Sequence, residues 1–210
     1  MDKARAPRGC YLGAVDLPFD PFERFAALYE QARAAIPVDP NAMVVATVGP
    51  DGQPSARVVL LKDFDARGFV FYTNLESRKG QDLLSHPQTA LVLHWAPLER
   101  QVRIEGRAER VSDAEADAYF RSRPRGSQVG AWASAQSRPL PSREQLEARV
   151  EELTRHYEGR DVPRPPHWSG FRVVPHRIEF WHARLSRLHE RLVYTREGAT
   201  GPWRTAMLNP

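Results

Sequence analysis

Five runs of β-branched and aromatic residues, separated by turn signals, fill the chain between residues 42 and 111. The runs read AMVVATV, ARVVLLKDF, GFVFYTN, TALVLHW and RQVRIEGRAERV, with turn segments such as GPDGQP and FDARG between them. In the last run Val102, Ile104 and Ala108 alternate with charged residues, beginning at Arg103. Such alternation gives a strand one buried and one solvated face, as antiparallel sheets commonly have. We therefore expect five β-strands in this region.

Helical patterns flank these strands. Residues 20–36, DPFERFAALYEQARAAI, combine a capping Asp20, Pro21 at the first helical position and Glu23 for a capping box. A short helix is expected at ESRKGQDLLSHP, with Arg78 and Lys79 in its first turn. Beyond the strands, further helices are expected after Ser112 with Glu115, at GSQVGAWAS, and from Ser142 with Gln145 to about Tyr157.

Three more strands are expected towards the C-terminal end, at FRVVPHRIEFWH, LHERLVYTRE and PWRTAML. Five strands, then helices, then three strands indicate an α+β fold with a mainly antiparallel barrel or sheet and flanking helices. The length of 210 residues suits one domain with a substantial core.

Composition limits the classes of function. The 30 basic residues are interleaved with 26 acidic ones, so a small anionic ligand explains the net charge of +4 as well as nucleic acid would, and no nucleic-acid partner is expected. No run of about 18 apolar residues and no secretory signal is present, which predicts a cytoplasmic protein without a membrane partner. The single Cys10 cannot form an internal disulfide, and without a CxxC pair or an HExxH helix no metal is expected.

Two groups of basic residues in the first half of the chain are candidate anion sites, because the common glycine-rich nucleotide loops are missing. At the start of the ESRKGQ helix, free N–H groups, the helix dipole, Arg78 and Lys79 would all favour an anion. The alternative is a solvated cationic turn. Arg57 and Lys62 bracket the apolar run VVLL. Residues five apart on an ideal strand point to opposite faces, so one of the two is expected near a strand end or bulge. Their alternative is snorkelling at the surface.

Two further groups follow in the second half. Tyr119 and Arg123 share one helix face, and with Arg125 and Ser127 beyond them they would suit a phosphate dianion, unless they are ordinary helix surface. In RLHER the three basic residues alternate along one expected strand and would face the same side. Such charges repel one another unless something anionic or electron-rich lies between them. The alternative for the histidine is a satisfied core or surface residue. The three residues are Arg187, His189 and Arg191.

Taken together, these groups resemble the pyridoxine (pyridoxamine) 5′-phosphate oxidase family. The motifs that carry the resemblance are ARVVLLK, GFVFYTNLESRKG, LERQVRIEG, YFRSRPRGSQVGAWAS, QS, HWSGFRV, RIEFWH and RLHERLVY, in this order from residue 42 onwards. The resemblance implies an FMN-binding split β-barrel over residues 20–210, preceded by an N-terminal arm at residues 1–19. This arm lacks the family's longer basic motif, and Tyr11 would stand in for its tyrosine. The ending TAMLNP also differs from the usual basic residue, leucine, alanine and proline.

The resemblance also implies the activity: oxidation of pyridoxamine or pyridoxine 5′-phosphate to pyridoxal 5′-phosphate, with O2 as acceptor and H2O2 as product. The enzyme would be a homodimer with FMN at the subunit interface. One subunit would bind FMN through Arg57, Val58, Val59, Leu60, Leu61, Lys62, Tyr72, Thr73, Arg78, Lys79 and Gln101, and its partner through Gln136, Ser137, Trp181 and Arg191. The substrate phosphate would be bound by Lys62, Tyr119, Arg123 and Ser127, with Arg187 and His189 as catalytic residues over the pyridine ring.

Two other functions fit parts of the pattern. A flavin oxidase of phenazine biosynthesis is similar to this family but acts on an unphosphorylated tricyclic substrate, and would not need a substrate-phosphate site. A non-catalytic split-barrel protein that binds flavin, haem or pyridoxal phosphate would not need two phosphate sites.

Overall fold

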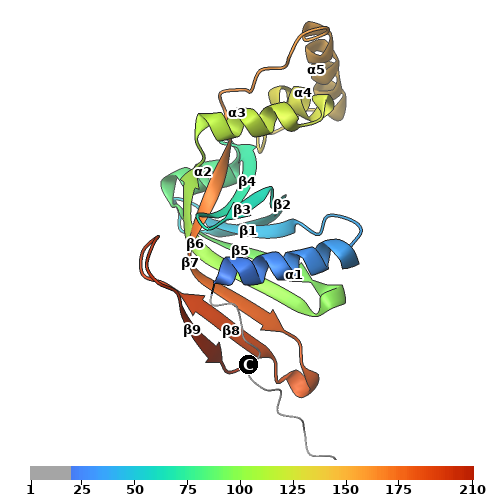
Figure 1. Cartoon of the computed structure of the whole chain (residues 1–210). Coiled ribbons are helices and arrows are strands. Elements are labelled where there is room, and N and C mark those ends of the chain that lie inside the picture. Colours follow the sequence, from blue (N-terminus) through green and yellow to red (C-terminus); the bar gives the residue numbers. More distant parts are fainter. Residues whose placement is uncertain (1–19) are drawn as a thin grey trace, which may run out of the picture.

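The computed structural model describes residues 20–210, so the arm expected at residues 1–19, with Cys10 and Tyr11, lies outside the described residues. A nine-stranded sheet with the order β2-β1-β5-β6-β7-β4-β3 dominates the described part; β8 pairs with β7, and β9 pairs with β8 (Figure 1). The strands are β1 (Ala42–Val48), β2 (Pro54–Leu60), β3 (Asp63–Asp65), β4 (Gly68–Asn74), β5 (Gln88–Trp95), β6 (Arg100–Arg110), β7 (Trp168–His182), β8 (Glu190–Thr195) and β9 (Arg204–Leu208). Each of these pairings is antiparallel, which confirms the expected α+β split β-barrel.

The run ARVVLLKDF, expected as one strand, forms two. The Leu61 N–H donates to the Asn41 carbonyl (2.8 Å), whereas the next N–H, that of Lys62, donates to the Val70 carbonyl (2.9 Å). The chain therefore changes partner between β2, which pairs with β1, and β3, which pairs with β4. Leu61 is 3% exposed and lies in the core, while Lys62 is exposed. Lys62 therefore lies between β2 and β3, which confirms that one of Arg57 and Lys62 is near a strand end.

The helices begin close to where the capping residues predicted. They are α1 (Pro21–Ala35), α2 (Arg78–Ser85), α3 (Asp113–Ser122), α4 (Arg125–Ala133) and α5 (Arg143–His156). The capping box of Ser112 and Glu115 is confirmed at α3. The box expected at α1 was wrong: the Asp20 carboxylate accepts from the Phe22 N–H (2.7 Å), one residue before Glu23, and this bond alone forms the side-chain cap.

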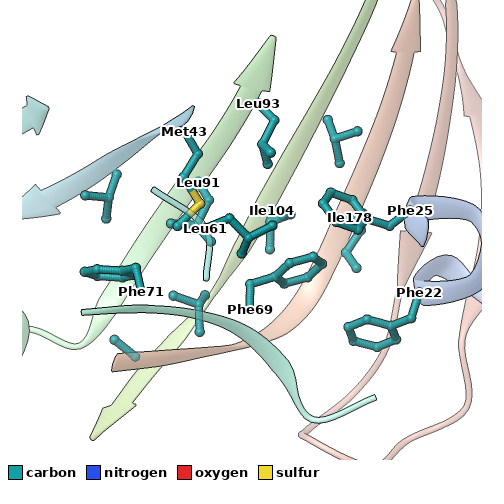
Figure 2. Packing of buried hydrophobic residues seen from close by; sticks show 14 of the residues in the cluster. Phe22, Phe25, Met43, Leu61, Phe69, Phe71, Leu91, Leu93, Ile104 and Ile178 are labelled. Carbon is teal, nitrogen blue, oxygen red and sulfur yellow. The ribbon is translucent and has the colours of Figure 1, made fainter. Parts of the chain in front are cut away.

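Helix α1 covers the apolar side of the sheet. Phe25 is fully buried, and its ring lies 4.8 Å from that of Phe64 and 4.9 Å from that of Phe69. Figure 2 shows Phe22 and Phe25 reaching from α1 towards Phe69 and Ile178. A side chain of this size contributes about 1.5–3 kcal/mol when it is buried. This core fixes the strands whose ends carry the site.

Strand β7 connects the two ends of the molecule. Its 15 residues begin beside α3 and end beside β8, and Figure 1 shows it running from the helical end to the β8–β9 end. Opposite β6 the register shifts between Glu105 and Gly106. Over residues 20–210 no helix combines the length and the apolar character that a membrane span requires.

Candidate functional site

A cavity of about 690 Å³ opens between the ends of β2, β4 and β7 and helices α2, α3 and α4. It brings together eleven of the expected site residues, from both the cofactor and the substrate sets. These are Val58, Val59, Leu60, Lys62, Tyr72, Thr73, Lys79, Tyr119, Arg123, Ser127 and Gln136. The remaining lining residues are Asn74, Ser122, Pro124, Gly130, Ala131, Ser134 and Trp168.

The start of α2 is held unusually close to the end of β4. A Cβ atom on Gly80 would lie 2.4 Å from the Leu75 carbonyl oxygen and 2.7 Å from that of Asn74, so only glycine permits this approach. Ser77 caps the helix by accepting from the Gly80 N–H (3.3 Å) and donates its hydroxyl to the Asn74 carbonyl (2.6 Å). Of the α2 residues, Lys79 in this first turn lines the cavity.

Lys79 projects from that turn into a polar, half-buried position. Its ammonium donates to Thr73 Oγ1 (3.1 Å), Ser77 Oγ (3.3 Å) and Gln136 Oε1 (3.2 Å). Burial lowers the pKa of Lys79, and the neighbouring charge of Arg57 lowers it further. All three acceptors are neutral, so they do not balance the positive charge of the ammonium, and the position suits a bound anion.

Arg57 is oriented towards the same place by two residues that the sequence reasoning missed. The Thr47 hydroxyl donates to Asp82 Oδ2 (2.6 Å) and accepts from Arg57 Nη1 (2.6 Å), while Asp82 lies 3.9 Å from Arg57 Nη2. Thr47 and Asp82 are 1% and 3% exposed. Burial lowers the pKa of Arg57, Asp82 opposes this, and Arg78 adds to it. Arg57 has Asp82 as its partner, whereas Arg78 and Lys79 nearby form no ion pair within residues 20–210, which leaves a positive charge suited to a phosphate dianion.

The second group of expected residues lies across the same cavity. We call Lys62, Tyr119, Arg123 and Ser127 the clamp. The Arg123 guanidinium is centred 4.8 Å from the Trp168 ring, and its Nη1 is buried without a hydrogen-bond partner. Burial lowers the pKa of Arg123, partly offset by Tyr119. A buried guanidinium N–H without an acceptor is costly, so this group also fits an anion.

An aromatic stack forms the surface beneath the clamp. The rings of Tyr72 and Tyr119 are 4.0 Å apart and 12° from parallel, and Tyr72 lies 5.3 Å from Trp168. Gly170 makes room for the stack, because a Cβ there would lie 2.7 Å from the Tyr72 ring. Arg125, in contrast, turns away and donates to the carbonyls of Tyr157 and Arg160.

The RLHER interpretation was partly wrong. Only Arg191 lies on a strand, β8, whereas Arg187 ends a short 3-10 turn, η2 (Leu185–Arg187), and His189 precedes β8. Ser186 and Arg187 both have positive φ, 56° and 61°, so the chain turns sharply where alternation was expected. The repulsion argument also fails for Arg191, because it forms an ion pair with the buried Glu179 (2.7 Å).

The remaining expected residues form a second cluster at the far end of β7. Gln101 faces Trp181 across β6 and β7, and Trp181 faces Arg191 across β7 and β8, so the three side chains share one face. The His189 ring lies 4.6 Å from that of Trp181, and Arg187 is exposed nearby on the loop that leads to β8.

We call the expected residues in and around the cavity, including Arg57 and Arg78, the first cluster. Gln136 and Ser137, which were assigned to the partner, belong to the first cluster of their own chain. Gln136 accepts from Lys79, and Ser137 Oγ accepts from the Arg78 N–H (3.2 Å). Three expected residues do not line the cavity: Leu61 lies in the core, Arg78 is exposed, and Arg57 contacts Thr47 and Asp82. The expected residues therefore divide between two ends of one chain.

Two family models together cover most of the chain. Residues 28–157 match the model of pyridoxamine 5′-phosphate oxidase, and residues 168–210 match the C-terminal dimerisation region of pyridoxine 5′-phosphate oxidase. The chain belongs to the pyridoxamine 5′-phosphate oxidase family. Membership confirms the resemblance drawn from the motifs, and the dimerisation region includes the whole second cluster except Gln101.

Relatives support the assignment over the full length. A pyridoxine/pyridoxamine 5′-phosphate oxidase of Myxococcus xanthus is 69% identical over 210 residues, all of both chains. One from Rubrobacter xylanophilus is 58% identical over 191 residues, covering 91% of this chain and 87% of that protein.

Solved structures show the same fold. PhzG from Burkholderia lata, in complex with tetrahydrophenazine-1-carboxylic acid, has a TM-score of 0.87 at 35% identity and covers 93% of this chain and 95% of its own. An FMN-binding protein from Nostoc punctiforme, related to pyridoxamine 5′-phosphate oxidase, has a TM-score of 0.73 at 16% identity over 91% of this chain and 98% of its own.

Proposed function

We propose that this chain is an FMN-dependent oxidase that converts pyridoxamine or pyridoxine 5′-phosphate into pyridoxal 5′-phosphate, with O2 as acceptor and H2O2 as second product. The observation that carries the proposal is the presence of two separate anion-binding groups in one cavity. One is Lys79, which lines the cavity and has Arg57 beside it, and the other is the clamp around Arg123. A cofactor phosphate and a substrate phosphate would require this pair.

The first group fits the FMN phosphate. Arg57, Arg78 and Lys79 provide charged donors, and the N-terminal end of α2 adds a favourable dipole. The β2 residues Val58, Val59 and Leu60 supply an adjoining apolar wall, of which Val58 is 65% exposed in the single chain. An aromatic flavin ring would cover this surface. When bound, FMN supplies the hydride acceptor of the reaction.

The second group fits the substrate phosphate. Arg123 offers its unpaired N–H, and Lys62, Tyr119 and Ser127 line the same wall. Anchoring the phosphate at this end fixes the reacting carbon at the other end of a small rigid substrate. The role of these residues is therefore orientation, and the role of the aromatic stack is to exclude water beside them.

We infer that the complete site lies at the interface of a homodimer. The second cluster would come from the partner and bring Arg187 and His189 over the substrate ring. Exposed apolar side chains accompany that cluster: Leu185 and Leu188 are 92% and 68% exposed, and Met207 is 62% exposed. Such residues are typical of a surface that a partner covers. Both phosphate ligands are membrane-impermeant anions, so we place the enzyme in the cytoplasm with them.

The phenazine-type oxidase remains the competing enzyme, since PhzG shares the fold. The tricyclic acid bound by PhzG carries a carboxylate and no phosphate, which requires fewer donors than the clamp of Lys62, Tyr119, Arg123 and Ser127 offers. Relatives that are 57–70% identical to this chain are named pyridoxine/pyridoxamine 5′-phosphate oxidase. A carrier without turnover would not use a second anion group either.

The test is peroxide release by the purified, yellow protein with pyridoxamine 5′-phosphate. Turnover only with a reduced phenazine, or tight flavin binding without any turnover, would refute the proposal.

A further inference from the structure

Arg164, in the loop before β7, has no role in the sites described so far, yet it links two of their parts. Its Nε donates to Asp117 (2.5 Å), its Nη2 to Asp113 (2.9 Å) and its Nη1 to the Trp168 backbone carbonyl (2.8 Å). Asp113 and Asp117 are four residues apart and share one face of α3. The Arg164 side chain is only 13% exposed. One guanidinium thus ties the helix of the clamp to the strand that carries Trp168.

The position of α3 relative to Trp168 decides where two members of the clamp, Tyr119 and Arg123, lie. Arg123 follows α3 directly and lies over the Trp168 ring, and Tyr119 on α3 is stacked 6.1 Å from that ring and 8° from parallel. Stacked rings tolerate sliding, because dispersion and hydrophobic contacts have little direction. The planar fork of an arginine, in contrast, fixes both distance and orientation towards its acceptors. Arg164 is therefore suited to fix the position of α3 relative to Trp168, which the stacked rings alone do not fix.

We propose that Arg164 is a positioning residue for the substrate phosphate, acting through α3 on Arg123. The identity of the ligand rests on the proposed function, whereas the coupling between the two arginines does not. Arg164 has no contact with the α2 turn among the described residues, so it should influence the substrate phosphate and leave the FMN phosphate unaffected.

A double-mutant cycle on the FMN-loaded dimer tests this coupling. The measurement is the dissociation constant of pyridoxal 5′-phosphate, by equilibrium dialysis, for the parent, Arg164→Met, Arg123→Ala and the double variant. Arg164→Met should weaken binding about tenfold, and Arg123→Ala by one to two orders of magnitude. In the double variant Arg164→Met should add less than about twofold, because its effect passes through Arg123. FMN affinity should be unchanged throughout.

Matched variants separate positioning from general stability. Arg143→Met removes an exposed ion pair with Glu147 (2.8 Å) on α5 and should leave the pyridoxal phosphate affinity unchanged. Arg164→Lys keeps the charge but cannot reach three acceptors in one plane, so it should resemble Arg164→Met. If Arg164→Met does not fold, Asp113→Asn with Asp117→Asn loosens the same link from exposed positions and should weaken binding in the same way.

Multiplicative effects in the double variant, or an equal loss of FMN affinity, would overturn the inference. So would unchanged affinity in the Asp113→Asn, Asp117→Asn variant. Peroxide release from pyridoxamine 5′-phosphate is measured separately on the parent. Its absence would refute the proposed function, while the binding cycle would still show whether Arg164 acts through Arg123.

Discussion

Trp168 and Trp181 lie near opposite ends of a single strand, β7, one beneath Arg123 in the cavity and the other beside His189. At about 3.3 Å per residue, the 13 steps from Trp168 to Trp181 span roughly 40 Å of strand. No flavin could touch both in one chain. If both clusters serve one site, that site must join the cavity of one subunit to the far end of β7 of its partner.

A complementation experiment follows from this separation. Chains with Arg78→Ala and Lys79→Ala lack the first cluster, and chains with Trp181→Ala and Arg191→Ala lack the second. Each variant alone should be nearly inactive. Refolded together in equal amounts, half of the dimers would be mixed and each would hold one intact site, giving about a quarter of the parental activity. No recovery, or a monomer of 23.9 kDa that retains FMN, would contradict an interface site.

The flavin phosphate should depend on the α2 turn. Arg78→Ala with Lys79→Ala removes two charged donors, each worth about 1.5–3 kcal/mol, so FMN binding should weaken roughly a hundredfold or more. The fold should persist, because Arg78 is exposed and the helix cap is made by Ser77. A fluorescence titration measures the affinity, and circular dichroism checks the fold. Unchanged FMN affinity would place the cofactor elsewhere.

As pH rises, FMN affinity should begin to fall at a lower pH than it would if Lys79 had the pKa of an ordinary lysine. Burial and Arg57 hold the pKa of Lys79 below its usual 10.5, and only the charged ammonium attracts phosphate. Binding is therefore strongest below that lowered pKa and weakens as pH rises through it. Lys79→Arg should remove this part of the pH dependence, and riboflavin, which has no phosphate, should not show it. A parallel pH profile for FMN and riboflavin would exclude the role of Lys79.

Arg123→Ala should separate substrate binding from cofactor binding. The protein should stay yellow, while the Michaelis constant for pyridoxamine 5′-phosphate rises by about one to two orders of magnitude, the loss of one charged hydrogen bond. Unphosphorylated pyridoxamine should be a very poor substrate for the parent and little worse for the variant. By comparison, Arg187→Ala or His189→Ala should lower the turnover number more than the FMN content. Equal losses with both substrates would mean that Arg123 does not bind phosphate.

The close approach of α2 to β4 should make Gly80 intolerant of substitution. In Gly80→Ala the new Cβ would meet the Leu75 and Asn74 carbonyl oxygens, which should cost about 1–3 kcal/mol and displace the α2 turn. Both the melting temperature and FMN affinity should fall. Gly126→Ala is the matched control, since a Cβ there meets nothing within 4 Å and the residue is helical. Equal melting temperatures for the two variants would show that α2 can move without loss.

Several site residues could not be found by reading motifs. Thr47 and Asp82 are 35 residues apart, and each looks like an unremarkable polar residue of a strand or a helix; only the packing of α2 on β1 joins them to Arg57. The sequence did not identify Arg164 either, because its partners on α3 lie 47 and 51 residues away. The only signal in the sequence was that Asp82 stands directly before the apolar pair Leu83 and Leu84 in a short helix.

The sequence by itself determined the strand and helix order, most helix starts and the basic groups around the site, because periodicity, capping and charge are local properties of the chain. Tertiary structure decided the rest. It split the second strand where pairing passes from Asn41 to Val70, and it bent RLHER into a turn at Ser186 and Arg187. It also placed the two clusters at opposite ends of β7, because the length and partners of a strand depend on contacts between residues far apart in the chain.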